Sequence, residues 1–247
     1  MLELDLWLEI AKSAALEGGN YLLQNQGKEL KVLMDSGRDI KLQLDTDTEK
    51  LIKETLSLQS SFSILGEETG LSNNLGEFYW VVDPLDGTSN FLRDIPISCV
   101  SIALMQDVTP ILGVIYDFNH DDLYFGHQNS KAFLNQNEIT VSDYSKKNQS
   151  TLVTGIPAKT HYSDEEFKNM INDFQDWKKV RMIGSAAMAA IYVAAGKAET
   201  YKENGIFLWD IAAGAAIVVA AGGVASIKNI QADYRVDAIF TNQHLAN

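Results

Sequence analysis

The feature that most constrains the fold is a series of short apolar runs in the first half of the chain. Between residues 63 and 135 turn-forming residues separate these runs, which read SILG, FYWVVD, ISCVSIALM, PILGVIYDF, DLYFGHQ and KAFLN. Apolar runs of this length, bounded by turn residues, are typical of β-strands. Strands that follow one another with few intervening helices favour an antiparallel sheet, so the sequence predicts a meander here.

Helical patterns precede this predicted sheet. Residues 2–26 repeat Leu, Ile and Ala at helical spacing, and residues 46–60 (TDTEKLIKETLSLQS) carry a partial apolar face of the same period. Between these segments, residues 28–45 predict a hairpin whose turn is DSGRD. We therefore expect the first half to lay N-terminal helices on an antiparallel sheet, which is an α+β arrangement.

The second half alternates strands with helices. STLVTGI, VRMIG, VASI and DAIFTN predict strands, and SDEEFKNMINDFQDW, SAAMAAIYVAAG and WDIAAGAAIVVAAGG predict helices. The polar stretch SDYSKKNQS marks a soft boundary near residue 145. We expect two parts: residues 1–145, with the antiparallel sheet, and residues 146–247, a smaller α/β half with a mixed sheet.

Charge and composition disfavour several classes of protein. The formal net charge is −13 and no run is rich in Lys or Arg, so the chain would repel a nucleic-acid backbone. No apolar run reaches the roughly 18 residues that a membrane span requires. Cys99 is the single cysteine, so no internal disulfide can form, and a reducing compartment, the cytoplasm, fits best. The acidic N-terminal segment also lacks the features of a signal peptide.

The stretch WVVDPLDGTSNF, residues 80–91, carries the strongest chemical signal. A strand that ends at Asp83 projects its carboxylate outward, and Asp86 returns to the same side after Pro84. Two like charges this close repel unless a cation lies between them, and such hard oxygen ligands suit Mg²⁺. Gly87 and Thr88 can offer N–H groups and a hydroxyl to an anion or an attacking water. The alternative is an ordinary Asp-Pro turn that caps the next segment.

Acidic residues elsewhere can join this pair. Glu67 follows a predicted strand in the stretch GEE, and Asp210 heads the small-residue helix WDIAAGAAIVVAAGG. Taken alone, Glu67 reads as a solvated turn and Asp210 as a helix N-cap.

Together, GEE, WVVDPLDGTSNF and WDIAAGAAIVVAAGG, in this order and at these separations, resemble the inositol monophosphatase family of Mg²⁺-dependent, lithium-sensitive phosphatases. The resemblance runs from DIKLQLDTDTEK to the terminal DAIFTN. It implies a layered αβαβα sandwich, hydrolysis of a small-molecule phosphate monoester, two or three Mg²⁺ ions per subunit, and a homodimer.

The resemblance also implies roles for individual residues. The metal ligands would be Glu67, Asp83, Asp86, Asp210 and the main-chain carbonyl of Leu85. The catalytic group would comprise Glu67 and the residues that orient the attacking water, Asp45 and Thr88, with Asp47 as the alternative to Asp45. The substrate and phosphate contacts would be Asp86, Gly87, Thr88, Gly184, Ser185, Ala186, Glu203 and Asp210.

Departures from the family pattern leave the substrate open. Lys41 and Leu42 replace the usual Val-Thr before the activating aspartate, and Leu92 and Arg93 stand where a histidine is usual. The choice is among inositol monophosphate, a 3'-phosphonucleotide such as a 3'(2'),5'-bisphosphate, fructose 1,6-bisphosphate and histidinol phosphate. DGTSNF and Glu203 favour the inositol branch. A binding or regulatory scaffold with the same fold and no activity is the non-enzyme alternative.

Overall fold

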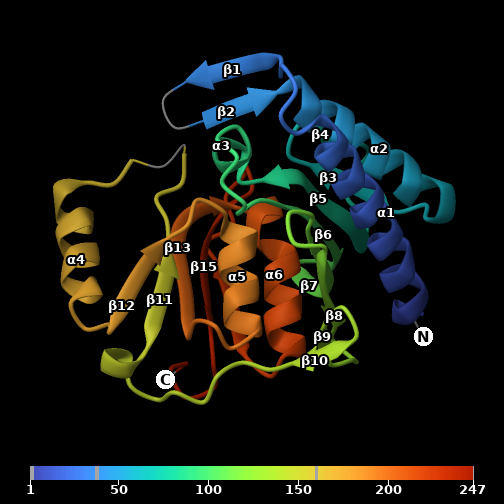
Figure 1. Ribbon diagram of the computed structural model, residues 1–247. Coiled ribbons are helices and arrows are strands. Elements are labelled where there is room, and N and C mark those ends of the chain that lie inside the picture. The colour runs from blue at the N-terminus through green and yellow to red at the C-terminus, as the bar shows by residue number, and fades with distance from the viewer. Residues whose placement is uncertain (1–2, 37–38, 159–160, 247) are drawn as a thin grey trace.

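The computed structural model describes residues 3–36, 39–158 and 161–246 (Figure 1). Helices α1 (Leu4–Asn25) and α2 (Gln43–Gln59) pack together and form the first layer of the molecule. The predicted hairpin is confirmed as strands β1 (Val32–Ser36) and β2 (Asp39–Leu42), although turn residues 37–38 lie outside the described residues. Helix α2 begins three residues before the predicted start, because a side chain in its first turn caps the Leu42 N–H.

An eight-stranded sheet forms the second layer, in the order β10-β9-β8-β7-β6-β5-β3-β4. Neighbours from β5 to β10 pair antiparallel, as the meander predicts, whereas β3 pairs parallel to β5. The short strands β4 and β10 were not expected from the sequence. The strand bounds are β3 Ser63–Gly66, β4 Gly70–Leu71, β5 Phe78–Asp86, β6 Cys99–Gln106, β7 Thr109–Asp117, β8 Asp122–His127, β9 Ala132–Leu134 and β10 Asn137–Ile139.

The third layer consists of α5 (Ala186–Ala194) and α6 (Leu208–Ala220), which lie between the two large sheets (Figure 1). Eight of the nine residues of α5 and nine of the thirteen residues of α6 are buried, which is typical of helices covered on most sides. Helix α6 approaches the first sheet so closely that a Cβ atom at Gly113 of β7 would collide with the Ala213 carbonyl. The small residues predicted to allow close packing therefore do so.

A five-stranded mixed sheet and helix α4 complete the layers. The sheet order is β12-β11-β13-β15-β14, in which β11 pairs parallel to β12 and β13, and β15 pairs antiparallel to β13 and β14. Helix α4 (Asp164–Phe174) lies outside this sheet (Figure 1). The strand bounds are β11 Thr151–Thr154, β12 Lys179–Met182, β13 Thr200–Phe207, β14 Val224–Lys228 and β15 Arg235–Thr241.

These layers confirm the predicted fold class, a mixed α/β sandwich with helices on an antiparallel sheet and a smaller mixed-sheet half. The strand β13 was not predicted, because its sequence, TYKENGIF, has no apolar run. The division into residues 1–145 and 146–247 stays a prediction. Within the described ranges, no helix combines the length and the apolar character needed to cross a bilayer.

Candidate active site

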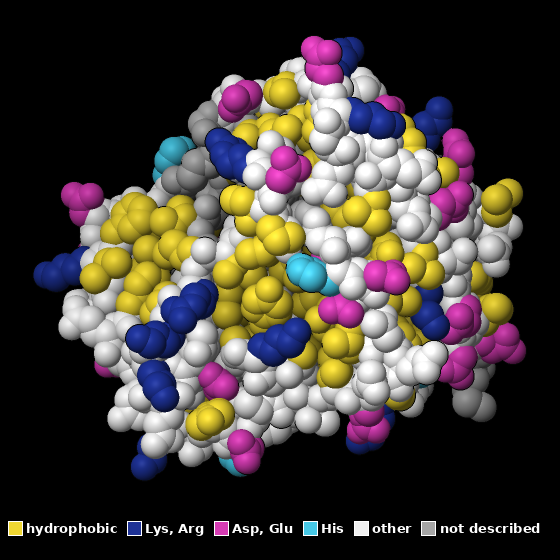
Figure 2. Space-filling model, in the orientation of Figure 1, with side chains coloured by type: hydrophobic (Ala, Val, Ile, Leu, Met, Phe, Trp, Pro, Cys, Tyr) yellow, Lys and Arg dark blue, Asp and Glu magenta, His cyan; other side chains and the backbone are white. Residues whose placement is uncertain are grey.

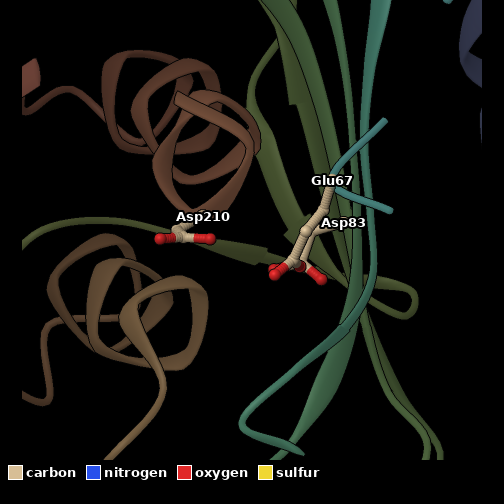
Figure 3. Close-up of side chains that lie close together, drawn as sticks. All are labelled: Glu67, Asp83 and Asp210. Atoms are coloured by element: carbon tan, nitrogen blue, oxygen red, sulfur yellow. The ribbon is translucent and has the colours of Figure 1, made fainter. Parts of the chain in front are cut away.

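Three carboxylates from distant parts of the chain meet at one end of the first sheet (Figure 3). Glu67 follows β3, Asp83 lies on β5, and Asp210 lies in the first turn of α6. Each offers an oxygen within 4.8 Å of the oxygens of the other two. Figure 3 shows Glu67 and Asp83 side by side, with Asp210 opposite them. We call these three residues the carboxylate cluster.

The electrostatics of the carboxylate cluster match a site built for a cation. Burial, together with the neighbouring charge of Glu68, raises the pKa of Glu67 to about 8. Burial, followed by the charges of the other cluster members, also raises the pKa values of Asp83 and Asp210 well above the usual range. A divalent cation between the carboxylates would offset this repulsion, and carboxylate oxygens are hard ligands, so these residues fit a metal ion such as Mg²⁺.

The spacing of Asp83 and Asp86 depends on an irregularity in β5. The sequence predicted that the strand ends at Asp83, but β5 continues to Asp86. The pairing of β5 with β6 shifts register between these two residues, as in a β-bulge. A regular strand would place residues three apart on opposite faces, so the bulge is what lets both carboxylates serve one site.

Asp86 joins the first sheet to the N-terminus of α5. Its Oδ2 atom accepts a hydrogen bond from the Ser185 hydroxyl (2.5 Å) and another from the Ala187 N–H (2.7 Å). Burial raises the pKa of Asp86 to about 6, although these hydrogen bonds act in the opposite direction. The predicted substrate contacts Ser185 and Ala186 thus lie beside a predicted metal ligand, at the start of α5.

The turn after Asp86 has a conformation that requires glycine. Gly87 has a φ angle of 90°, and a Cβ atom there would lie 2.7 Å from the Ile97 carbonyl oxygen. Helix α3 (Thr88–Phe91) begins at the next residue, and the Thr88 hydroxyl donates to the Leu85 carbonyl at 3.0 Å. The turn therefore brings the hydroxyl predicted to orient the water against the carbonyl predicted to bind metal.

Asp45 is buried in the first turn of α2 and keeps one oxygen free of hydrogen bonds within the described residues. Its Oδ2 accepts from the Leu42 N–H at 2.8 Å, whereas its Oδ1 is buried without a partner. Burial raises the pKa of Asp45 to about 7, and its charge in turn raises the pKa of Glu67. Asp47 is exposed and accepts from the Gln43 amide at 3.0 Å. The geometry thus favours Asp45 over Asp47 as the carboxylate of the site.

Glu203 lies on the side of the second sheet. It lies on β13 and is only 8% exposed, so it is a buried carboxylate and not a solvated loop residue. Burial raises the pKa of Glu203 to about 8, with a contribution from the charge of Asp86. The charges of Glu203 in the second half and Asp86 in the first half therefore interact across the layers.

Sequence reasoning missed Asn90, which connects the two halves. Its side-chain amide donates to the carbonyls of Ile97 and Ile183, each at 2.8 Å. Gly184 follows with a φ angle of 76°, and a Cβ atom there would lie 3.1 Å from the Asn90 amide nitrogen. The turn-forming character of Asn two residues after Asp-Gly-Thr was the available signal.

Comparison with known proteins agrees with this geometry. The model of the inositol monophosphatase family matches residues 3–239. The chain is 38% identical over 220 residues to the Nus factor SuhB of Xylella fastidiosa, covering 87% of this chain and 80% of that protein. It is 34% identical over 228 residues to a fructose-1,6-bisphosphatase/inositol-1-monophosphatase of Aquifex aeolicus, covering 91% and 86%.

A solved structure gives the same result for the fold. The inositol monophosphatase from Anabaena superposes with a TM-score of 0.84 and 33% identity, covering 98% of this chain and 92% of that one. The family is metal-dependent and acts on small phosphate monoesters, which agrees with the carboxylate cluster. This chain therefore belongs to the inositol monophosphatase family and is a phosphatase, a phosphoric monoester hydrolase.

Proposed function

We propose that this phosphatase uses Mg²⁺ to hydrolyse inositol monophosphate. The observation that carries the proposal is the carboxylate cluster, which lies next to Asp86 and to the buried, unpartnered oxygen of Asp45. The cluster, Asp86 and the Leu85 carbonyl would hold two or three ions. When bound, Mg²⁺ would lower the pKa of a water molecule and neutralise charge on the phosphate and the leaving oxygen.

The residues of the chain would orient the reaction. Asp45 would accept a proton from the attacking water at Oδ1, since Oδ2 is already held by Leu42. The Thr88 hydroxyl would orient the same water while it donates to the Leu85 carbonyl. The positive end of the α5 dipole, which now faces Asp86, would attract the phosphate toward Gly184, Ser185 and Ala186. In-line attack then needs no phosphorylated side chain.

Glu203 supports a substrate with one phosphate and several hydroxyl groups. Its carboxylate is buried close enough to Asp86 for their charges to interact. An ionised Glu203 would accept a hydrogen bond from a ring hydroxyl, and it would repel a second phosphate. The repulsion favours inositol monophosphate over fructose 1,6-bisphosphate and the 3'(2'),5'-bisphosphates. Fructose 1,6-bisphosphate should still be tested as a substrate, because the Aquifex relative is a fructose-1,6-bisphosphatase/inositol-1-monophosphatase.

A binding scaffold is the second candidate, and its support is that relatives of this chain, such as the one from Xylella fastidiosa, are Nus factors. Pull-down with wild-type protein and with Asp86→Asn would distinguish it, because a partner bound independently of turnover should be captured by both.

We also propose a cytoplasmic homodimer. Figure 2 shows hydrophobic side chains gathered around α4 and β12, and a second copy of the chain could cover them. Ile171 of α4 and Met182 of the edge strand β12 are each 51% exposed. The net charge of −13 argues against nucleic acid as the primary partner. Light scattering after size exclusion would give the mass.

Phosphate release from a substrate panel tests the enzymatic proposal. The panel holds inositol 1-phosphate, a 3'-phosphonucleotide, fructose 1,6-bisphosphate and histidinol phosphate, each with Mg²⁺ and with chelator. We expect Mg²⁺-dependent release that is fastest from inositol 1-phosphate, and none from Asp210→Asn. Release that persists in chelator would refute the metal mechanism, and a different preferred substrate would refute the inositol assignment.

A further inference from the structure

Helix α2 carries a second buried carboxylate, one turn after Asp45. Glu49 is 0% exposed and lies four residues after Asp45, so the two side chains share one face of the helix. The family resemblance implied no role for Glu49. Its position inside the protein requires partners, because a buried charge without them is strongly unfavourable.

Those partners are the backbone and side chain of the turn after β3. The Oε2 atom of Glu49 accepts from the Glu68 N–H at 2.7 Å. Its Oε1 atom accepts from the Thr69 N–H at 3.1 Å and from the Thr69 hydroxyl at 2.5 Å. Lys53, one turn further along α2, forms an ion pair with Oε1 at 2.9 Å. One carboxylate therefore satisfies two successive N–H groups of the turn.

The turn that Glu49 holds is the one that presents Glu67 to the carboxylate cluster. On the other side of the turn, the Glu67 N–H donates to the Val82 carbonyl of β5 at 3.1 Å. The close approach of α2 depends on Gly66, because a Cβ atom there would collide with the Glu49 carboxylate. The backbone at Glu67 is thus fixed by β5 before it and by α2 after it.

We propose that Glu49 is a positioning residue that fixes Glu67 relative to Asp45 and thereby sets the affinity of the site for Mg²⁺. The inference rests on the proposed function, in which Glu67 binds metal and Asp45 orients the water. One rigid helix then carries the water-orienting carboxylate directly and controls the metal-binding carboxylate through the turn. Outer groups that hydrogen-bond around metal ligands have effects of 10–100-fold on metal affinity or activity in other proteins.

A purely structural role makes a different prediction. If Glu49 only stabilises the fold, its loss would lower the thermal midpoint, but the folded protein would bind Mg²⁺ as before. The two roles therefore separate in a measurement of Mg²⁺ affinity made without substrate.

The test is isothermal titration of Mg²⁺ into the full-length Glu49→Gln variant. Glutamine keeps the size of the side chain but places an NH₂ group against one of the N–H donors, which loosens the turn. We expect the Mg²⁺ dissociation constant to rise about 10- to 100-fold. Activity should recover at high Mg²⁺, with the KM for inositol 1-phosphate unchanged.

Two control variants on α2 reproduce separately the two side effects of Glu49→Gln, which are the loss of a negative charge and the loss of stability. Glu54→Gln removes an exposed carboxylate from the same helix, and Leu56→Ala destabilises the buried face without touching the turn. Both should bind Mg²⁺ with wild-type affinity. If Leu56→Ala weakens Mg²⁺ binding as much as Glu49→Gln does, the effect is one of general stability and the inference is wrong.

If Glu49→Gln does not fold, a milder variant tests the positioning role of Glu49. Thr69→Val removes the hydroxyl that donates to Glu49 and accepts from Lys53, and it keeps the backbone N–H that donates to Glu49. We expect a rise of a few-fold in the Mg²⁺ dissociation constant, and an unchanged isotherm would overturn the inference. If the wild-type protein binds no Mg²⁺, the proposed function itself fails. Wild-type affinity in both Glu49→Gln and Thr69→Val would refute only the positioning role.

Discussion

Asp86→Asn should abolish turnover and at the same time stabilise the metal-free protein. Asparagine has the same shape as aspartate, and its carbonyl oxygen can still accept from the Ser185 hydroxyl and the Ala187 N–H. The hydrogen bonds between β5 and the start of α5 should therefore persist. The variant loses one negative charge. The proposed metal site requires this charge, whereas the charge destabilises the fold when no metal is bound.

The pKa of Asp86 gives the size of the stability effect. Burial raises this pKa from 3.8 to about 6, so ionisation of Asp86 costs the folded state about 3 kcal/mol, at 1.36 kcal/mol per pKa unit. Because the folded pKa is raised, the cost is absent below the unfolded pKa, grows as the pH rises between the two values, and is complete above pH 6. Asparagine resembles the neutral acid, so the gain above pH 6 is at most about 3 kcal/mol, or roughly 6–12 °C in Tm.

The assay compares thermal unfolding of the two proteins in chelator at pH 4.5 and at pH 7.5, with phosphate release in Mg²⁺ measured in parallel. The variant should exceed the wild type in Tm at pH 7.5, and the difference should shrink at pH 4.5. A variant that is less stable than the wild type at pH 7.5 in chelator would show that burial does not penalise the ionised Asp86 carboxylate. Undiminished kcat would show that this carboxylate lies outside the active site.

Three further predictions concern the same region. The increase in Tm on addition of Mg²⁺ should grow as the pH rises from about 4.5 to 8. The carboxylate cluster has raised pKa values, so the metal-free fold loses stability as the cluster ionises. An increase in Tm that stays constant with pH in differential scanning fluorimetry would contradict this. Asn90→Ala leaves the carbonyls of Ile97 and Ile183 without their donor, so urea unfolding should show a loss of about 1–3 kcal/mol, and steady-state kinetics a reduced kcat. Gly87→Ala forces a Cβ atom against the Ile97 carbonyl and should remove most phosphate release while circular dichroism stays close to wild type.

The meander and the helices were predictable because their apolar residues repeat with the period of the element that they form. Strand β13 was not, because Glu203 points into the protein at a position where the strand pattern calls for an apolar residue. A buried carboxylate at this position breaks the local signal from which the strand would be inferred. The sequence likewise placed the start of α2 too late, since Asp45 is both a capping residue and a site residue.

The individual candidate residues followed from motif resemblance, but their connections did not. Pro84 signals an irregularity in the strand, but the register shift between Asp83 and Asp86 depends on pairing with β6. The contacts of Glu49 and Asn90 join residues far apart in the chain, and one sequence carries no record of such pairs.

The small residues of the central helices explain how the second half places Asp210 beside Glu67 and Asp83 at the end of the first sheet. Asp210 can reach Glu67 and Asp83 only if α6 lies close against the strands that carry them. Glycine at residue 113 lets the α6 backbone touch β7, and Gly214 lets α5 and α6 approach each other at Ala190. A larger residue at either contact would move the N-terminus of α6 away from the cluster. The Ala- and Gly-rich sequence of α6 therefore supports the geometry of the carboxylate cluster, although none of its alanines or glycines belongs to the cluster.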